Sequence, residues 1–419
     1  MAEPLEARGA LPPSSPGRGW IAALVMATVG VAIGWYGPLQ ILLPTQVEHI
    51  AGTGKESVLA LVTGSGAAAA MIANPAWGAL SDRLRARGHS RLPVLVAGVL
   101  LAIAGLMILP FAHTPALVTM GWLIAQTGLN GPFAVLTALI ADRVPDARRG
   151  LVGSLFGVAQ LVGTVVGTAV AVVIGEVFLG YLAVAVAVPL LIAPFVVLDR
   201  RLPADVPTDQ ASDQPMRAGE RRLQLRSVRI DRVFVAAFSL RFLLNLVSAI
   251  GLLYLLYFLT DRARVDEPAT WVLVLTVAYV AVAGTAAALA GPLSDRIGRR
   301  TPLAAGACLV LAVGAVTLAF AGTMPLIVTA VLLLGVGYGL FLGVDVAIIT
   351  NALPDPRTRA TLLGVASIGS TLPQVLAPVI AAPTVTSIGG YPLLYLVTAA
   401  IALLALATLP TLRRRVRAV

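Results

Sequence analysis

The feature that most constrains this chain is a series of long apolar stretches, each about as long as a lipid bilayer is thick. A helix needs about 20 mostly apolar residues to cross the hydrocarbon core of a membrane. Of the 419 residues 58% are hydrophobic and only 12% are charged, whereas a soluble protein has about 25% charged residues. Backbone groups inside lipid must be hydrogen-bonded within their own segment, which favours helices. The sequence therefore predicts an all-α integral membrane protein.

Twelve such stretches can be recognised, and a polar segment separates the first six from the last six. The predicted spans are residues 20–43, 58–80, 92–112, 116–141, 150–175, 180–198, 233–259, 269–292, 302–321, 325–352, 360–382 and 391–411. We expect five parts, which are a disordered cytoplasmic tail (1–19), an N-terminal six-helix half (20–198), a cytoplasmic linker (199–232), a C-terminal six-helix half (233–411) and a basic cytoplasmic tail (412–419).

Basic residues alternate between the two sides of the predicted helices. Of the 30 basic residues, 26 fall in the two tails and in every second connection, and only Lys55, Arg262 and Arg264 fall on the other side. Cytoplasmic connections of membrane proteins carry the excess of Arg and Lys. We therefore expect a multi-pass protein of the plasma membrane with both termini in the cytoplasm.

The two predicted halves carry the same short motifs at equivalent places. GALSDR (78–83) matches GPLSDR (291–296) at an offset of 213, and ADRVPDARRG (141–150) matches TNALPDPRTRA (350–360) at an offset of 209. Each pair follows the same span of its half, first the second span and then the fourth. Two ordered matches at similar offsets indicate gene duplication. Related halves of this kind are typical of transporters, whose substrate site lies near the middle of the membrane.

The repeated loop resembles the signature loop of the major facilitator superfamily. GPLSDRIGRR (291–300) is a close match, whereas the first copy has extra residues inserted before Gly88 and carries His89 where Arg is usual. The resemblance covers the whole chain and implies a major facilitator fold, with loops that latch the cytoplasmic side in the outward-open state. It assigns this gating role to Gly78, Asp82, Arg83, Gly291, Asp295, Arg296 and Arg300. The alternative is a basic turn that only sets topology.

The loop residues have physical properties that suit such a latch. A glycine such as Gly78, at the end of a span, allows a neighbouring helix to approach closely. An aspartate such as Asp82 can accept hydrogen bonds from N–H groups at the N-terminus of a facing helix, where the helix dipole favours an anion.

A second likeness is to the sugar-transporting branch that includes melibiose permease and plant sucrose transporters. It rests on NPAWGALSDRLRARGHSRLP, RFLLNLVSAIGLLYLLYFLTD and GVDVAIITNALPD. Sodium-coupled members of that branch carry two carboxylates four residues apart in the second span, the second directly before proline. Here these positions hold Ala70 and Asn74, before Pro75, so we expect no sodium site there.

Two opposite charges are predicted to lie deep in the membrane. Arg241 is nine residues past Arg232 on an outward span, and Asp345 is nine residues before Pro354 on an inward span. At 1.5 Å per residue both lie about 13 Å from the cytoplasmic boundary. Intramembrane charges usually pair and face a cavity. We therefore expect an Arg241–Asp345 pair, acting in proton coupling or substrate binding, or else as a static packing element.

Other polar and aromatic residues inside the spans are candidates for the lining of a substrate cavity, because aromatic rings stack well on flat solutes. The alternative for each is a contact that holds two helices together. The candidates are Trp35, Gln40, Asn74, Trp77, Gln126, Asn130, Gln160, Asn245, Tyr254, Tyr257, Tyr338 and Gln374.

The sequence carries no catalytic motif that we recognise. GTGKES (52–57) lacks the first glycine of a P-loop and has Glu56 where Ser or Thr should follow the lysine. We expect no enzyme activity, no metal and no cofactor, with a proton gradient as the driving force. The expected partners are a small-molecule substrate and the lipid bilayer, with no nucleic acid, and the expected state is a monomer.

Three functions remain open at this point. They are a proton-coupled symporter for a small organic solute such as a glycoside, a proton-driven exporter of drugs or secondary metabolites, and a non-transporting sensor. Antiporter families usually carry a Gly-Pro pair in the fifth span, whereas GVAQLVGTVVGTAV (157–170) has no proline. This difference favours the symporter.

The orientation can be tested by cysteine labelling in intact cells. We expect an impermeant maleimide to label Thr53→Cys, which lies on the predicted outer side, and to spare Ser212→Cys in the predicted cytoplasmic linker. Labelling of Ser212→Cys without Thr53→Cys would reverse the predicted topology.

Overall fold

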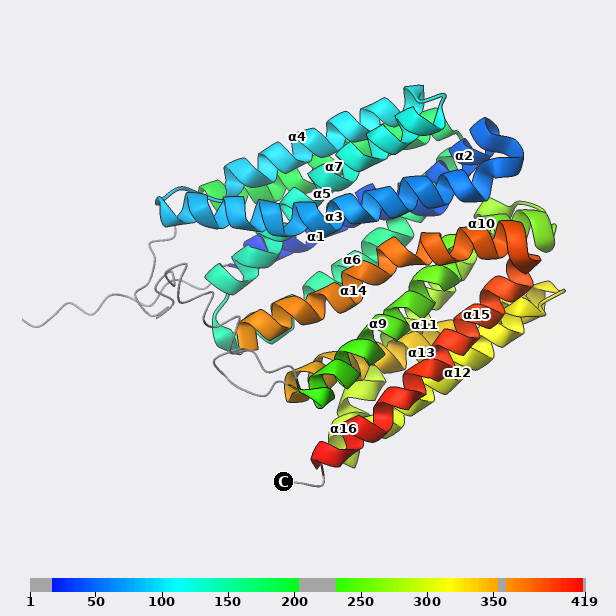
Figure 1. Ribbon diagram of the computed structural model, residues 1–419. Coiled ribbons are helices and arrows are strands. Elements are labelled where there is room, and N and C mark those ends of the chain that lie inside the picture. Colours follow the sequence, from blue (N-terminus) through cyan, green and yellow to red (C-terminus); the bar gives the residue numbers. More distant parts are fainter. Residues whose placement is uncertain (1–16, 203–230, 353–358, 417–419) are drawn as a thin grey trace, which may run out of the picture.

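The computed structural model describes residues 17–202, 231–352 and 359–416, and the regular structure within these ranges is entirely helical. The first half comprises α1 (Arg18–Gly37), α2 (Leu43–Ala51), α3 (Lys55–Ala86), α4 (Leu92–Ile108), α5 (Pro115–Arg143), α6 (Asp146–Ile174) and α7 (Val177–Arg200). The second half comprises α9 (Arg232–Leu253), α10 (Leu255–Tyr257), α11 (Pro268–Ile297), α12 (Thr301–Ala319), α13 (Met324–Ala352), α14 (Arg359–Pro383), α15 (Gly390–Ala405) and α16 (Leu409–Val416). Figure 1 shows the two halves as two helical bundles lying side by side.

The predicted fold class is confirmed, with a difference in the first two spans. Eleven helical segments of the described residues are long and apolar enough to cross a membrane, and the first runs from Arg18 to Ala86. As one straight helix its 69 residues would extend about 100 Å, roughly three times the thickness of the hydrocarbon core. The chain instead turns back at Gly52, whose φ is 52°, so the segment crosses twice and the bundle has twelve crossings (Figure 1).

The boundaries of two predicted parts also change. The first predicted span ends at residue 43, but helix continues through α2 because Leu43 and Val47, four residues apart, are both fully buried. The predicted basic tail is helical as far as Val416. Most of the predicted N-terminal tail and linker lie outside the described residues.

The same helix pairs pack in both halves. In the first half α1 packs on α6 and α7 and α4 packs on α5, and in the second half α9 packs on α14 and α15 and α12 packs on α13. Two of these crossings are close because glycines lie at the contact. The glycines are Gly105 and Gly128 between α4 and α5, and Gly314 and Gly337 between α12 and α13. Each glycine of the first half is 209 residues before its counterpart in the second, which is the offset found in the loops. The repeat therefore extends from the loops to the helix crossings.

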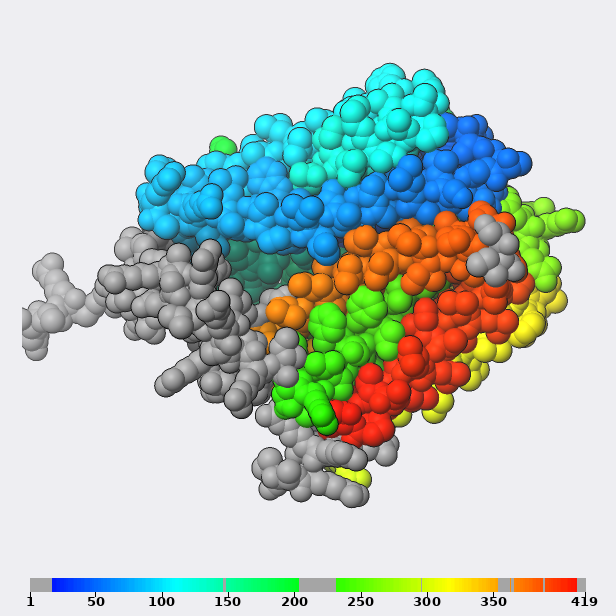
Figure 2. All heavy atoms as spheres, in the orientation of Figure 1, coloured from blue at the N-terminus to red at the C-terminus, as the bar shows by residue number. Residues whose placement is uncertain are grey.

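The two halves contact each other at one end of the bundle and separate toward the other. We call the end that holds Arg18, Arg200 and Arg232 the arginine-rich end, and the opposite end the Lys55 end. Between the halves α3 packs on α14 and α6 packs on α11. On α6, seven of the nine residues 150–158 near the arginine-rich end are exposed, but only one of the ten residues 163–172 farther along is. Figure 2 shows the resulting recess between α3 and α14.

The close crossing of α4 and α5 generates a stability prediction. A β-carbon at Gly105 would lie 2.2 Å from the backbone nitrogen of Ala125, so the two helices would have to move apart. We expect Gly105→Ala to destabilise the fold by about 1–3 kcal/mol, as overpacking does. In the control Gly157→Ala, the new methyl group meets nothing within 4 Å, and alanine is the better helix former by about 0.5–1 kcal/mol. Thermal unfolding in detergent should therefore give a lower Tm only for Gly105→Ala, and equal values would contradict the close crossing.

Candidate functional site

The predicted pair of intramembrane charges is present in the structure. Nη2 of Arg241 on α9 lies 3.1 Å from Oδ2 of Asp345 on α13. Asp345 is 6% exposed, and Nε of Arg241 is buried and has no hydrogen-bond partner among the described residues. Arg241 therefore neutralises the carboxylate and keeps a donor free for another group. The functional role of the pair stays a prediction.

Two of the predicted cavity residues extend this pair into a polar cluster. Nδ2 of Asn245 donates to the backbone oxygen of Arg241 at 2.8 Å, and the hydroxyl of Tyr338 donates to Oδ1 of Asn245 at 3.2 Å. The ring of Tyr338 stacks on Tyr279, with centroids 6.3 Å apart. We call the residues Arg241, Asn245, Tyr279, Tyr338 and Asp345 the central cluster.

Sequence reasoning missed Tyr279 and its partner Ser248, whose hydroxyls lie 3.0 Å apart. Ser248 is seven residues after Arg241, two turns along the same face of α9. That spacing is the signal by which it could have been found.

Gln40 connects the two halves at a second polar site. It lies in the short π-helical turn Pro38–Leu42 that follows α1. Its Oε1 accepts hydrogen bonds from Thr168 on α6 at 2.9 Å and from Thr276 on α11 at 2.8 Å. Because α6 and α11 belong to different halves, Gln40 is placed where a relative movement of the halves would break a hydrogen bond.

Several other candidates hold helices of the first half together, which is the alternative that the sequence left open. Nδ2 of Asn74 on α3 donates to Oδ1 of Asn130 on α5 at 3.2 Å, and Nε1 of Trp77 donates to the backbone oxygen of Thr127 at 2.7 Å. Nδ2 of Asn130 in turn donates to the backbone oxygen of Gln126 at 2.8 Å. These side chains bind α3 to α5.

The remaining candidates are dispersed. Trp35 packs edge-on against Phe133 at 5.2 Å, and its buried Nε1 has no hydrogen-bond partner among the described residues. Gln160 on α6 is half-buried, and Gln374 on α14 is exposed. Trp35 therefore offers a second free donor, on the first half.

Tyr254 and Tyr257 lie at the Lys55 end, where they take part in the contact between the halves. The hydroxyl of Tyr254 donates to the backbone oxygen of Glu56 at 2.9 Å, and that of Tyr257 donates to the backbone oxygen of Pro44 at 2.8 Å. Both side chains are fully buried. They close this end of the bundle instead of lining an open cavity.

Lys55 is the centre of this contact. Its Nζ lies 2.7 Å from Oε1 of Glu48 in its own half and 2.8 Å from Oδ1 of Asp261 in the other half. It also lies 4.6 Å from the centroid of the Tyr257 ring, and the hydroxyl of Tyr391 donates to the second oxygen of Asp261 at 3.0 Å. We call Glu48, Lys55, Tyr257, Asp261 and Tyr391 the Lys55 clasp.

The electrostatics of the clasp keep Lys55 charged. Lys55 lies in the connection between the first two crossings, outside the apolar spans. Burial by itself lowers the pKa of Lys55, but the hydrogen bonds and charges of Asp261 and Glu48 outweigh it and raise the pKa above its usual 10.5. A raised pKa means that the ion pairs contribute fully below pH 10.5 and lose their contribution only as the pH rises further. The clasp is therefore intact throughout the physiological range.

The repeated loops at the arginine-rich end have the same backbone. Gly88 and Gly298 have φ values of 76° and 65°, in the left-handed region that favours glycine. The next helices begin immediately after Arg91 and Arg300, which are 209 residues apart. At the helix start Arg91 is therefore the counterpart of Arg300, while His89 directly follows Gly88 as Arg299 directly follows Gly298.

Arg91 organises the first loop. Its Nε donates to Oδ2 of Asp142 at 2.8 Å and its Nη1 donates to Oδ1 of Asp82 at 2.6 Å. Arg85 donates to the other oxygen of Asp142 at 2.6 Å. The side chain of Asp82 is 69% exposed and, among the described residues, receives no hydrogen bond from a facing helix N-terminus. The contact predicted for Asp82 in the latch is therefore not made among the described residues.

The other predicted loop residues differ in their surroundings. A β-carbon added to Gly78 would meet nothing within 4 Å, so the expected close helix approach is absent there. Near Gly291 two helices do approach closely, because a β-carbon on the facing Gly343 would lie 2.7 Å from the β-carbon of Ala290. Nη1 of Arg300 donates to the backbone oxygen of Ala347 at 2.8 Å. Arg83 and Arg296 are exposed, and the side chain of Asp295 lies outside the described part of the chain.

Comparison with known proteins supports the architecture. The sequence matches the family described as Major Facilitator Superfamily over residues 19–271 and 265–418. No curated protein matches the sequence.

Three solved structures share the fold. A bacterial homologue of the human lysosomal transporter Spinster, in an inward-facing and occupied conformation, has 14% identity and a TM-score of 0.76 over 97% of this chain and 98% of its own. The peptide transporter POT in complex with sulfate has 15% identity and a TM-score of 0.72 over 96% of both chains. A mutant form of the nucleoside transporter NupG has 13% identity and a TM-score of 0.73 over 94% of this chain and 99% of its own.

The clasp generates a prediction about the distance between the halves. Replacing Lys55 by Met leaves the carboxylates of Glu48 and Asp261 facing each other without a cation, and like charges repel. We expect spin labels at Thr53→Cys and Asp266→Cys, both exposed positions at this end, to show longer distances in Lys55→Met. The native Cys308 is buried and should not compete for the label.

The matched control for this measurement is Arg262→Gln. Arg262 is an exposed cation next to Asp261 and makes no ion pair among the described residues. Its loss should leave the label distances unchanged. Unchanged distances in Lys55→Met as well would show that the clasp does not hold the halves together.

Proposed function

We propose that this chain, which belongs to the major facilitator superfamily of membrane transporters, moves a small organic solute by alternating access and couples that movement to protons. The observation that carries the proposal is the buried ion pair between Arg241 and Asp345, on helices α9 and α13. Ionisable residues at this depth are costly and usually mark an ion or substrate pathway.

The arginine-rich end faces the cytoplasm in this proposal. The excess of basic residues at that end supports this orientation through the positive-inside rule. The recess between α3 and α14 then opens to the cytoplasm, and the Lys55 clasp is the closed outer gate. The conformation described here is accordingly inward-open.

Proton coupling follows from the geometry of the pair. While Arg241 contacts Asp345 at 3.1 Å, the guanidinium stabilises the carboxylate and no proton is needed. When a substrate draws the guanidinium away, an isolated buried carboxylate is costly, and taking up a proton removes that cost. Substrate binding and proton binding are linked because each takes one partner of the same ion pair.

A free donor of the central cluster indicates the kind of solute. Nε of Arg241 lacks a hydrogen-bond partner among the described residues, so the solute must offer an acceptor oxygen or nitrogen. The stacked rings of Tyr279 and Tyr338 in the same cluster provide a flat apolar surface. A glycoside has both features, and the likeness in sequence to sugar transporters makes it the first class to test.

The direction of coupling distinguishes this proposal from its alternative, proton-driven export. In antiporter families the fifth span usually carries a Gly-Pro pair. Here that span is α6, which runs from Asp146 to Ile174 without a proline. We therefore assign symport, in which solute and proton move the same way.

The test uses proteoliposomes that enclose a pH-sensitive dye. Solutes from a panel of glycosides, dipeptides and nucleosides are added outside, and the dye reports proton movement. Symport predicts acidification of the lumen with at least one solute, whereas exchange of solute for protons predicts alkalinisation. A panel in which no solute moves protons in wild-type protein would contradict proton coupling.

The role of Asp345 can be tested in the same system. We expect Asp345→Asn to abolish solute-driven proton movement, because an amide cannot take up the proton, while counterflow exchange of labelled solute continues. Proton movement by Asp345→Asn at the wild-type rate would reduce the ion pair to a packing element.

A comparison of two variants of Arg241 provides the control for misfolding. Arg241→Ala leaves an unpaired buried acid, a loss that costs about 3–5 kcal/mol when a buried pair is broken from one side. Arg241→Gln combined with Asp345→Asn leaves no buried charge and should unfold at a higher temperature than Arg241→Ala. A coupling defect in the well-folded double variant then reflects the lost charges and not misfolding.

A further inference from the structure

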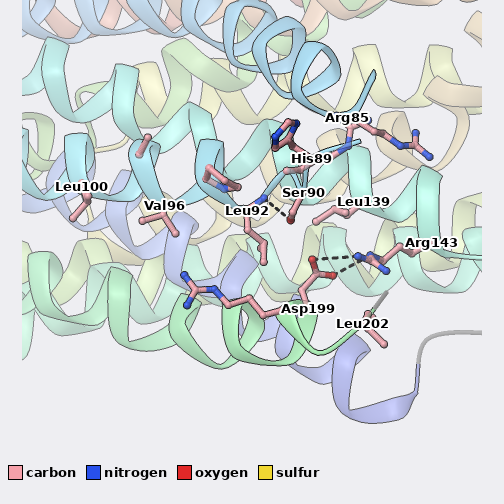
Figure 3. Close-up of a pocket in the computed structure, with 14 residues that line it drawn as sticks. Arg85, His89, Ser90, Leu92, Val96, Leu100, Leu139, Arg143, Asp199 and Leu202 are labelled. Atoms are coloured by element: carbon pink, nitrogen blue, oxygen red, sulfur yellow. Dashed lines mark hydrogen bonds and ion pairs between the residues drawn. The ribbon is translucent and has the colours of Figure 1, made fainter. Parts of the chain in front are cut away.

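A cavity lies far from the central cluster, at the arginine-rich end of the first half. Its volume is about 640 Å³, and it lies between α4 and α7, beside the end of α5. In Figure 3 Val96 and Leu100 lie at one end of it, and Arg85 and Arg143 lie toward the other. The cavity is therefore apolar at one end and basic at the other.

The cavity is at the outer side of the bundle, where the protein meets lipid. α4 packs on α5 and α7, and α7 packs on α1 and α4, and Figure 1 shows both helices on the side of the first half that faces away from the second. Leu100 on α4 and Val197 on α7 are 62% and 50% exposed. Exposed apolar side chains on membrane-spanning helices face acyl chains, so the cavity opens toward the bilayer.

Most of the charges in the cavity wall are already paired. Arg143 and Asp199 form an ion pair at 3.0 Å, and Asp199 also accepts from Nε1 of Trp20 at 2.9 Å. Arg85 and Arg91 both bind Asp142. These contacts make the wall rigid but leave it little net charge of its own.

Arg200 is the exception among these charged residues, because its side chain is not paired within the described residues. It lines the cavity and is exposed, and it makes no ion pair or hydrogen bond through its side chain within the described residues. It occupies the last position of α7, and helical side chains lean back toward the helix N-terminus. The guanidinium is thereby directed toward the apolar part of the bundle.

The beginning of α4 connects the basic end of the cavity to its apolar end. Ser90, Leu92 and Pro93 line the cavity where α4 begins. From there Val96 and Leu100 continue along α4 for about 12 Å at 1.5 Å per residue, which provides an apolar path for the start of an acyl chain.

We propose that this cavity binds one anionic phospholipid from the leaflet at the arginine-rich end. Arg200 contacts the phosphate, and the acyl chain lies along Val96 and Leu100. Free phosphate shares the first contact but makes no use of the second. Basic pockets between membrane helices are suited to anionic headgroups, and the apolar path favours a lipid over a soluble anion.

The test is native mass spectrometry of the detergent-solubilised protein with added phosphatidylglycerol. We expect one tightly held phosphatidylglycerol per chain, and weaker retention of phosphatidylcholine. Arg200→Gln should lower the affinity for phosphatidylglycerol about fivefold, since one basic residue near an anionic headgroup contributes roughly 1 kcal/mol. Arg200 has no structural partner among the described residues, so this variant should fold.

The matched control is Arg201→Gln, which removes the neighbouring exposed arginine that does not line the cavity. It should retain wild-type affinity. Leu100→Trp at the exposed apolar end should weaken phosphatidylglycerol binding and leave any binding of inorganic phosphate unchanged.

Two outcomes would overturn the proposal. Equal losses in Arg200→Gln and Arg201→Gln, or equal retention of phosphatidylcholine and phosphatidylglycerol, would show that the cavity does not recognise the headgroup. Inorganic phosphate that displaces the lipid and binds Leu100→Trp as well as wild type would assign the site to a soluble anion.

Discussion

The structure depends on one constraint, that lipid cannot hydrate a polar group. Every backbone amide inside the membrane is therefore paired within a helix, and the helices approach each other through small residues such as Gly105 and Gly128, since lipid gives them little hydrophobic reason to associate. The same constraint explains why the carboxylate of Asp345 lies 3.1 Å from Arg241. A charge that cannot be hydrated must keep a partner, so any event that removes the partner must supply another, either a proton or a bound solute.

The two ends of the bundle pair their charges in different ways. At the arginine-rich end Asp82, Asp142 and Asp199 are bound by arginines of their own half. At the Lys55 end one ammonium group is shared between Glu48 of the first half and Asp261 of the second. Charges paired within a half do not resist separation of the halves, whereas a shared cation does. This asymmetry accounts for a bundle that is closed at one end and open at the other.

The sequence predicted the features that depend on distance along the chain. Span length gives the number of crossings, and counting residues from a boundary gives the matching depths of Arg241 and Asp345, so the pair could be foreseen. Contacts that depend on packing between distant segments could not. Lys55 and Asp261 are 206 positions apart, and nothing in the sequence shows that α2 stays helical and brings them together.

Asn74 and Trp77 look the same in sequence whether they face a cavity or bind α3 to α5. The role of Arg91 was not foreseen because an insertion hides its alignment with Arg300, although the offset of 209 contains the information.

The strength of the Lys55 clasp is consistent with a gate that opens during a cycle. Glu48 and Asp261 are about one-third exposed, and ion pairs with exposed partners contribute roughly 0–1 kcal/mol each. Of the tyrosine hydrogen bonds, those to Pro44 and Glu56 cross between the halves and add about 1 kcal/mol each. With the Lys55–Asp261 ion pair, the contacts that cross between the halves total on the order of 2–3 kcal/mol, which is below the roughly 5.5 kcal/mol that moves a two-state equilibrium from 1:99 to 99:1. A much stronger contact would hold the halves in one state, and a much weaker one would not keep the Lys55 end closed. In the transport cycle that we propose, differences in the binding free energy of a solute and a proton between the two states decide between them, because the central pair changes partners in the same step.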